Sequence, residues 1–229
     1  MLEKFLPLPQ FNFHSNDPLL LLSGPPSSGK TSLAFQFAIN SATGNDGNAV
    51  FICNRRKLET KPPYLAQGID PSSDVINRIQ MKYIDDEEGI KKYFAAFHMH
   101  DPAPVSVIID DFADFFDEGN CQERYNNTRG RDLAMVRVLA LCRNAIMHAN
   151  EKGPCQLLLS DTHTGDSPRL LYIYKRWVSS IYTIKGDGFG SYLIRSGSNL
   201  GVAKSAKYSI ALQYLVYEGI TEDEEQSDE

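Results

Sequence analysis

One octapeptide, Gly-Pro-Pro-Ser-Ser-Gly-Lys-Thr at positions 24–31, constrains the fold more than any other stretch. It follows an apolar run at 19–22 and precedes apolar residues at helical spacing in 32–38. The order strand, glycine-rich loop, helix is the context that the pattern G-x-x-x-x-G-K-[ST] requires. Glycines at 24 and 29 permit backbone angles that side chains forbid, so that the loop N–H groups and the next helix can converge on an anion.

The sequence therefore predicts a phosphate-binding loop with assigned tasks. The Lys30 ammonium is expected to reach the β- and γ-phosphates of a nucleoside triphosphate, and the Thr31 hydroxyl is expected to hold Mg²⁺. The residues predicted to bind the nucleotide are Gly24, Pro25, Pro26, Ser27, Ser28, Gly29, Lys30, Thr31 and Ser32.

Two carboxylates end the apolar run at 105–109. A P-loop site needs an acid at a neighbouring strand tip to hold the hydration shell of Mg²⁺, and Asp110 fits this role. Asp111 is the predicted catalytic group beside Lys30, because hydrolysis needs a group that orients or deprotonates water. A surface acid that points away from the site is the alternative for Asp111.

Apolar runs alternate with helical patterns along most of the chain. Strands are expected at 18–23, 49–53, 79–84, 105–109 and 156–160, and helices at 30–40, 85–99, 131–150 and 168–176. The stretches 178–185, 190–195 and 208–217 alternate between apolar and polar residues, with glycine-rich turns between them. This order predicts an α/β fold with a mostly parallel sheet and a C-terminal antiparallel β extension.

Two stretches between these elements are predicted to be loops. Residues 113–128 are polar, acidic and aromatic, and residues 161–166 follow the strand at 156–160. Ligands of parallel sheets bind at the carboxyl edge, so Thr162 or His163 could sense the γ-phosphate. A solvated loop histidine is the alternative.

The expected domain organisation is simple. Residues 1–17 form an extended leader, residues 18–217 form one domain, and residues 218–229 form an acidic, disordered tail. The chain has 23 Lys and Arg against 29 Asp and Glu, and seven of these acids lie in 218–229 without a base. The body is therefore close to neutral, and its bulk charge does not demand a nucleic-acid partner.

The composition favours an intracellular protein without a membrane segment. The four cysteines have no C-x-x-C spacing and indicate neither a zinc site nor a disulfide framework. No apolar run approaches the roughly 18 residues of a membrane helix, and the first residues lack the pattern of a signal peptide.

Three groups of cationic residues follow the predicted strands, and aromatic residues accompany two of them. They are Arg55, Arg56 and Lys57; Arg124, Arg129 and Arg131 with Tyr125; and Arg169, Lys175 and Arg176 with Tyr172, Tyr174 and Trp177. Cations interleaved with rings suit single-stranded nucleic acid, because charges meet phosphates and rings stack on bases. Core or partner-facing aromatic residues are the alternative. The predicted DNA-binding residues are the cations of the second and third groups, namely Arg124, Arg129, Arg131, Arg169, Lys175 and Arg176.

The chain resembles the RecA recombinase core over roughly 18–200. The resemblance rests on the P-loop, on the run from 79–88 through a helix to the acidic strand at 105–111, and on the arginine-bearing segment 126–131 before a long helix. Within that superfamily the chain most resembles the small recombinase-paralogue ATPases that partner SWIM-type zinc-finger proteins in Shu complexes. The resemblance lies in its small size, the lack of an N-terminal helical domain and the run 50–56.

This resemblance implies a function and a set of partners. It implies ATP and Mg²⁺ binding, ATP hydrolysis, single-stranded DNA binding, and support of recombinase filaments in homologous recombination DNA repair. The implied DNA-facing loops lie around 124–131 and 161–176. The implied partners are a SWIM-type zinc-finger protein and a recombinase or recombinase paralogues, and the implied location is the nucleus.

The chain departs from the RecA pattern at two positions. Arg55 stands where the catalytic glutamate would align, and 161–163 replaces the glutamine expected after the fourth strand. A guanidinium stays protonated and cannot act as a base. We therefore expect slow hydrolysis, with Asp111 as the nearby base. A non-catalytic nucleotide-binding scaffold is one alternative. A small-molecule kinase is another, although the sequence shows no Arg-rich lid segment.

The stretch 35–38 is similar to the Phe-x-x-Ala element by which recombinases polymerise. Its position in an amphipathic helix favours packing in the core instead.

Overall fold

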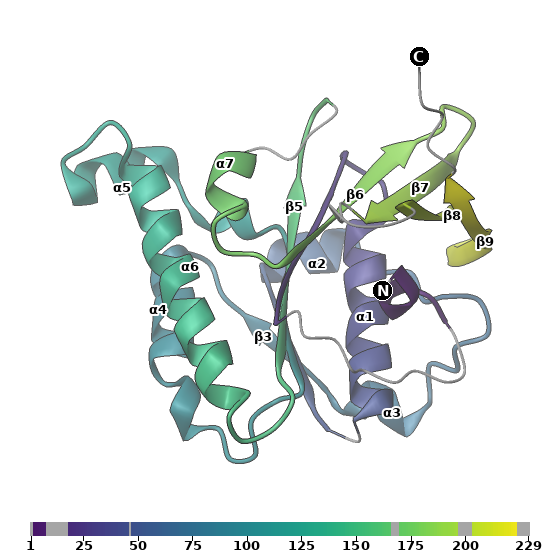
Figure 1. Ribbon diagram of the computed structural model, residues 1–229, viewed down its shortest axis with the longest axis horizontal. Helices are drawn as coiled ribbons and strands as arrows, with labels where there is room; N and C mark the ends of the chain where they lie inside the picture. Colours follow the sequence, from purple (N-terminus) through teal and green to yellow (C-terminus); the bar gives the residue numbers. More distant parts are fainter. Residues whose placement is uncertain (1, 8–17, 46, 166–169, 197–202, 224–229) are drawn as a thin grey trace.

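The computed structural model describes residues 2–7, 18–45, 47–165, 170–196 and 203–223. Their strands form a nine-stranded sheet with the order β3-β2-β4-β5-β1-β6-β7-β8-β9 and with helices on both faces (Figure 1). Every neighbouring pair from β3 to β6 is parallel, and every pair from β6 to β9 is antiparallel. The predicted α/β fold, with a mostly parallel sheet and antiparallel C-terminal strands, is confirmed, and it agrees with a RecA-like core.

The parallel part is buried on both faces at its centre, whereas its first and last strands in the sheet order are partly exposed. Its strands are β1 (Leu19–Gly24), β2 (Ala49–Cys53), β3 (Ile79–Tyr83), β4 (Ser106–Ile109), β5 (Gln156–Thr162) and β6 (Ser180–Gly186). Leu19 and Leu21 of β1 belong to one core, while Leu20 and Leu22 belong to the core on the opposite face. Strands covered on both sides read as continuous apolar runs, as predicted. β6 was expected in the antiparallel extension, but it pairs in parallel with β1.

The helices divide between the two faces. The longer ones are α1 (Lys30–Gly44), α4 (Glu87–Ala95) and α6 (Gly130–Ala149); the shorter ones are α2 (Arg55–Thr60), α3 (Asp74–Asn77), α5 (Glu118–Tyr125) and α7 (Leu171–Tyr174). Figure 1 shows α4 and α6 on one face of the sheet and α1 on the other. Phe37 and Ala38 of α1 are fully buried, which confirms core packing for 35–38. None of the helices in the described ranges has the length and hydropathy that a membrane span requires.

The prediction of a loop at 113–128 is wrong. A 3-10 helix at Phe112–Phe115 and helix α5 occupy most of this stretch. The Asp117 carboxylate accepts a hydrogen bond from the Asn120 N–H at 2.8 Å and caps α5. Cys121 of α5 is buried in the core. The acidic composition therefore suggested a loop where the chain forms a helix that is capped by Asp117 and packs through one face, which includes Cys121.

The described part of the N-terminal segment is helical and buried, not extended. Residues Leu2–Phe5 form a 3-10 helix. The Phe5 ring is fully buried, with its centroid 5.7 Å from that of Phe37 and 5.0 Å from that of Tyr182. The Tyr217 hydroxyl donates a hydrogen bond to the Phe5 carbonyl. Apolar residues of the predicted leader thus complete the core, while residues 8–17 lie outside the described ranges.

The C-terminal strands bend back toward α1. They are β7 (Ser191–Ser196), β8 (Ala203–Ala211) and β9 (Tyr214–Asp223). Elsewhere in the chain, a short 3-10 helix, Phe97–Met99, lies between α4 and β4. Leu215 of β9 exchanges backbone hydrogen bonds with Leu65 and Gln67, which lie between β2 and β3 in the chain. The connection after β2 and the last strand therefore meet beside the α1 layer.

The predicted boundary of the acidic tail is too early. β9 continues through Asp223, so residues 218–223 belong to the sheet. The Glu218 carboxylate accepts a hydrogen bond from Ser191 at 2.9 Å and pairs with Lys207 at 3.1 Å. These contacts balance the negative charge of Glu218 within the strand. The charge count of 218–229 alone gave no sign of such partners. Residues 224–229 lie outside the described part of the chain.

Candidate nucleotide-binding site

The glycine-rich loop joins β1 to α1 at the carboxyl edge of the parallel strands. Gly29 precedes α1 in the left-handed region, with φ of 79°, as the sequence predicts. At position 24 a glycine is needed for a different reason, namely lack of space for a side chain. A Cβ atom at Gly24 would lie 2.8 Å from the Ile184 Cβ, which is a clash rather than a backbone restriction. A Cβ at Gly29 would also lie 2.9 Å from the Ile210 Cδ1.

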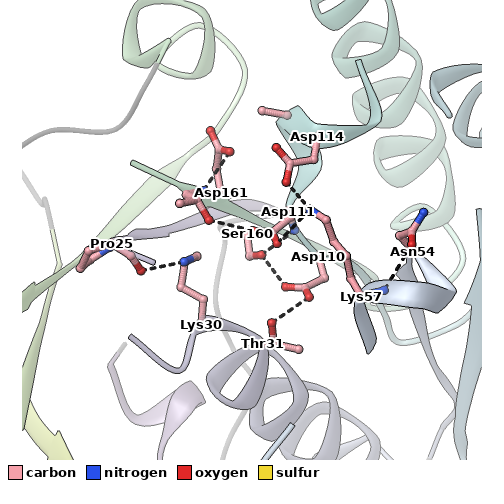
Figure 2. Close-up of polar contacts among 12 residues, drawn as sticks. Pro25, Lys30, Thr31, Asn54, Lys57, Asp110, Asp111, Asp114, Ser160 and Asp161 are labelled. Carbon is pink, nitrogen blue, oxygen red and sulfur yellow. Dashed lines mark hydrogen bonds and ion pairs between the residues drawn. The ribbon is translucent and has the colours of Figure 1, made fainter. Parts of the chain in front are cut away.

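Lys30 lies at the first position of α1 and is nearly buried, with 7% of its surface exposed. Its Nζ donates a hydrogen bond to the Pro25 carbonyl at 2.9 Å (Figure 2). Burial lowers the pKa of this ammonium group, and the charges of Asp111 and Asp110 oppose that shift. A phosphate oxygen would replace a neutral carbonyl with a charged acceptor, which forms a stronger hydrogen bond.

The predicted metal ligands meet in the structure. Thr31 Oγ1 donates to Asp110 Oδ2 at 2.9 Å, and Ser160 Oγ donates to Asp110 Oδ1 at 2.6 Å (Figure 2). Burial and the neighbouring charge of Asp111 raise the pKa of Asp110 from 3.8 to about 6, against the effect of the two hydroxyl donors. A hydroxyl and a carboxylate are hard oxygen ligands, which Mg²⁺ prefers together with phosphates. The residues present therefore fit a Mg²⁺–nucleotide complex.

Asp111 lies beside this pair and lines the cavity that extends from the P-loop. Its backbone N–H donates to Ser160 Oγ at 2.8 Å, and its Oδ1 accepts from Thr162 Oγ1 at 3.0 Å. Lys57 Nζ lies 3.6 Å from the Asp111 Oδ2. The alternative of an acid that points away from the site does not describe this geometry. The catalytic role of Asp111 stays a prediction.

The end of β5 separates the two residues considered for phosphate sensing. β5 continues through Thr162, so the predicted loop starts two residues later than expected. Thr162 lines the cavity. His163 is 2% exposed, and its Nδ1 lies 2.7 Å from the Ser23 Oγ. Thr162, and not His163, therefore faces the cavity.

A cavity of about 860 Å³ extends from the P-loop, within the size range of small-molecule sites. Segments far apart in the chain line it, including Tyr64 after α2 and Tyr192 of β7. The Tyr192 hydroxyl donates to the Ser27 carbonyl at 3.2 Å, and the buried Tyr208 hydroxyl donates to the Ser28 carbonyl at 2.6 Å. The C-terminal extension thus holds the loop from outside.

Sequence reasoning missed these tyrosines. Tyr192 is 165 residues from its loop partner and Tyr208 is 180 residues from its own. Alternating patterns predicted the two strands but not their position over the P-loop. Lys57 was recognised as a cation at a strand tip, without any signal that it reaches the acids after β4.

Arg55, which the RecA resemblance places at the position of a catalytic glutamate, does not line the cavity. Its guanidinium lies over the Tyr83 ring, 4.4 Å from the centroid. The cation–π contact holds Arg55 against β3.

The predicted DNA-binding residues fall into two sets. Arg124 pairs with Glu87 and, at 2.7 Å, with Glu88, while Arg131 Nη2 donates to the Ala113 carbonyl at 2.9 Å. These two side chains make contacts inside the molecule. Arg129, Lys175 and Arg176 are exposed near the start of α6 and after α7, and Arg169 lies outside the described residues.

We expect Arg124→Ala to lower the free energy of unfolding by about 2 kcal/mol, because it leaves the buried Glu87 carboxylate without its cation. Glu87 has 4% of its side chain exposed. Urea unfolding measures the change, and hydrogen exchange of α5 locates it. Arg129→Ala, which removes an exposed cation nearby, should leave stability unchanged. Unaltered stability with weaker DNA binding would instead assign Arg124 to the DNA interface.

The fold and the site together define an α/β protein with a phosphate-binding loop, of the kind found in P-loop nucleotide-binding proteins. No family model matches the sequence. Among curated proteins, the chain is similar to the human protein named ATPase SWSAP1, with 29% identity over 102 residues. The match covers 44% of this chain and 43% of the human protein, so less than half of either is compared.

Proposed function

We propose that this protein is a recombinase paralogue that binds ATP with Mg²⁺, hydrolyses it slowly, and binds single-stranded DNA. In this role it supports recombinase filaments during homologous recombination DNA repair. Two observations support the proposal. The fold agrees with a RecA-like core, and part of the sequence is similar to a human protein named as an ATPase.

The observation that carries the nucleotide part is the Thr31–Asp110 hydrogen bond of 2.9 Å. It joins the residue after the P-loop lysine to the acid at the end of β4, across 79 positions of sequence. Two oxygen ligands are thereby held together at the mouth of the loop, next to Lys30. When bound, Mg²⁺ would neutralise the phosphates, and Lys30 would orient the β- and γ-phosphates.

Slow turnover follows from the groups around Asp111. Asp111 follows the expected metal ligand Asp110 and is the acid that we propose activates water, but it accepts a hydrogen bond from Thr162 and lies near Lys57. Arg55, at the position of the missing glutamate, stacks on the Tyr83 ring. The Asp111 carboxylate is therefore already engaged by its neighbours, and the Arg55 guanidinium cannot act as a base in its place.

An exposed basic surface supports the DNA part. It consists of Arg129, Tyr172, Lys175 and Arg176. The Tyr172 hydroxyl donates to Asp132 at 2.7 Å, which joins α7 to the start of α6. The Asp132 hydrogen bond raises the pKa of Tyr172, and the Arg129 charge opposes that shift. Cations around an exposed ring can contact phosphates while the ring stacks on a base.

We expect the double substitution Lys175→Ala with Arg176→Ala to weaken single-stranded DNA binding and to make it less salt-dependent. Loss of two phosphate contacts should reduce the slope of log K against log salt by about 1.4. Fluorescence anisotropy with a labelled oligonucleotide at several salt concentrations measures the slope. The double substitution of Lys92 and Lys152, both exposed elsewhere, is the charge-matched control. An unchanged slope would exclude this surface.

The central test of the proposal is the ATPase rate of the purified protein with and without single-stranded DNA. A low rate that DNA increases would support a DNA-coupled ATPase. A background rate with retained ATP binding would support the second candidate, a nucleotide-stabilised scaffold, which the contacts around Asp111 and Arg55 favour. Transfer of phosphate to an added metabolite would support a kinase.

The partners that we propose are a SWIM-type zinc-finger protein and a recombinase or its paralogues, with function in the nucleus. Co-purification of the full chain with each partner tests the assembly. An apolar group at the turn tips, Phe189 and Leu212, is 95% and 92% exposed and is the first region to substitute in such an experiment.

A further inference from the structure

We propose that Lys57 of α2 is a second phosphate-binding cation of this site, which contacts the terminal phosphate of a bound nucleoside triphosphate. Through this contact the protein would favour the triphosphate over the diphosphate. The inference rests on the proposed binding of a nucleotide at the P-loop, and it assigns a residue on the opposite side of that site.

Lys57 and Lys30 reach the cavity from opposite sides. Lys30 enters from α1, which follows β1, whereas Lys57 enters from α2, which follows β2. The acids at the end of β4 lie between them (Figure 2). The sheet order β2-β4-β5-β1 explains this placement. A triphosphate that extends from the P-loop toward Asp110 therefore directs its terminal phosphate toward Lys57.

The present partners of Lys57 are exchangeable. Its Nζ pairs with Asp114 and lies 3.6 Å from the Asp111 Oδ2. The side chains of Lys57 and Asp114 are 53% and 43% exposed, and ion pairs this exposed contribute little to stability. Although partial burial disfavours the charge, Asp114 and Asp111 raise the pKa of Lys57. The side chain is thus a full cation held loosely beside the cavity.

An ion pair of 3.6 Å with Asp111, followed by hydrogen bonds through Ser160, connects Lys57 to the expected metal ligands. Asp111, which neighbours Lys57, donates its N–H to Ser160 Oγ at 2.8 Å. Ser160 Oγ in turn donates to Asp110 at 2.6 Å, and Asp110 accepts from Thr31. Thr31 and Asp110 would hold a Mg²⁺ that accompanies the β- and γ-phosphates. Lys57, 3.6 Å from the residue that follows Asp110, would then lie on the side of the terminal phosphate.

The helical phase of α2 selects Lys57 over Arg55. Two residues apart on a helix, side chains point in nearly opposite directions. Arg55 stacks on Tyr83, outside the cavity, and Lys57 consequently faces the acids after β4. Where the sequence lacks the expected carboxylate, the structure thus presents a cation to the same region.

The test compares binding of ATPγS and ADP in the presence of Mg²⁺, by displacement of a fluorescent nucleotide from the full chain. We expect Lys57→Met to lose about tenfold in ATPγS affinity, since one charge-assisted contact is removed, with ADP affinity unchanged. Lys57→Arg should keep most of the preference, because it keeps a cation. Thermal unfolding with each nucleotide should show the same selective loss of triphosphate stabilisation.

Three further variants distinguish a contact from other effects. Asp114→Asn frees Lys57 and should retain the preference for ATPγS. Lys91→Met removes an ion pair on α4, outside the cavity, and should change neither affinity. Arg56→Met removes a charge from the cavity lining, and an equal loss of preference there would overturn the inference by indicating a general field effect.

The outcomes separate this inference from the proposed function. An unchanged ATPγS-to-ADP ratio in Lys57→Met would overturn the role of Lys57 while leaving nucleotide binding intact. Equal wild-type affinity for both nucleotides would do the same. If the wild-type protein bound neither nucleotide, the proposed function itself would fail.

Discussion

Lys30→Ala is expected to reduce affinity for ATPγS about 100-fold and to bring ATP hydrolysis to background. The ammonium donates to the Pro25 carbonyl of the loop and is expected to contact two phosphates. Two charge-assisted contacts at roughly 1.5 kcal/mol each account for this loss. Equilibrium binding with a fluorescent nucleotide measures affinity, and phosphate release measures turnover.

Lys152→Ala is the matched control, because Lys152 is exposed at the turn before β5, at the opposite edge of the sheet. Circular dichroism and thermal unfolding without nucleotide should show that Lys30→Ala remains folded. Binding that survives in a folded Lys30→Ala protein would place the nucleotide elsewhere and would contradict the assignment of the P-loop.

Asp110→Asn is expected to have opposite effects on stability and on metal use. Without metal at pH 7, it should raise the free energy of unfolding by roughly 2 kcal/mol, because it removes a buried charge beside Asp111. With Mg²⁺ and ATPγS, it should lose most of the stabilisation that the wild type gains, since one metal ligand is gone. Urea unfolding in both conditions measures the two effects.

The pH dependence of the stability gained by Asp110→Asn tests whether the Asp110 charge causes that gain. The pKa of Asp110 is about 6 in the folded protein, above its ordinary value of 3.8. The folded state therefore binds this proton more tightly, and the contribution of Asp110 to stability falls as the pH rises from about 4 to about 6. The gain from Asp110→Asn should be small at pH 4 and full at pH 7. A gain independent of pH would show that the charge is not its cause.

Local signals in the sequence were sufficient for the centre of the site. The spacing of Gly24, Gly29 and Lys30 and the acids after β4 depend on a few neighbouring residues, and the structure brings Thr31 and Asp110 into contact. Apolar runs predicted the central strands β1, β2, β4 and β5 for the same reason, because burial on both faces leaves no room for polar residues.

Weak or conflicting local signals explain the errors. The acidic composition of 218–223 indicated a tail, but pairing with β8 places it in β9. Helix α5 is short and polar, and one buried face with Arg124 pairing holds it in place. Arginines with neighbouring aromatic residues predicted DNA contacts, and this stays a prediction; nothing in the sequence indicated that Arg124 and Arg131 also have partners inside the molecule.

The sequence by itself determined the α/β class, the P-loop, and the acids that face it, because each depends on residue spacing over one strand, loop or helix. Only the tertiary structure decided that Tyr192 and Tyr208 hold the loop, that Thr162 rather than His163 lines the cavity, and that Lys57 reaches the acids after β4. These features depend on sheet order and on the bend of the C-terminal strands. Both bring together residues more than 50 positions apart, and no local pattern records such contacts.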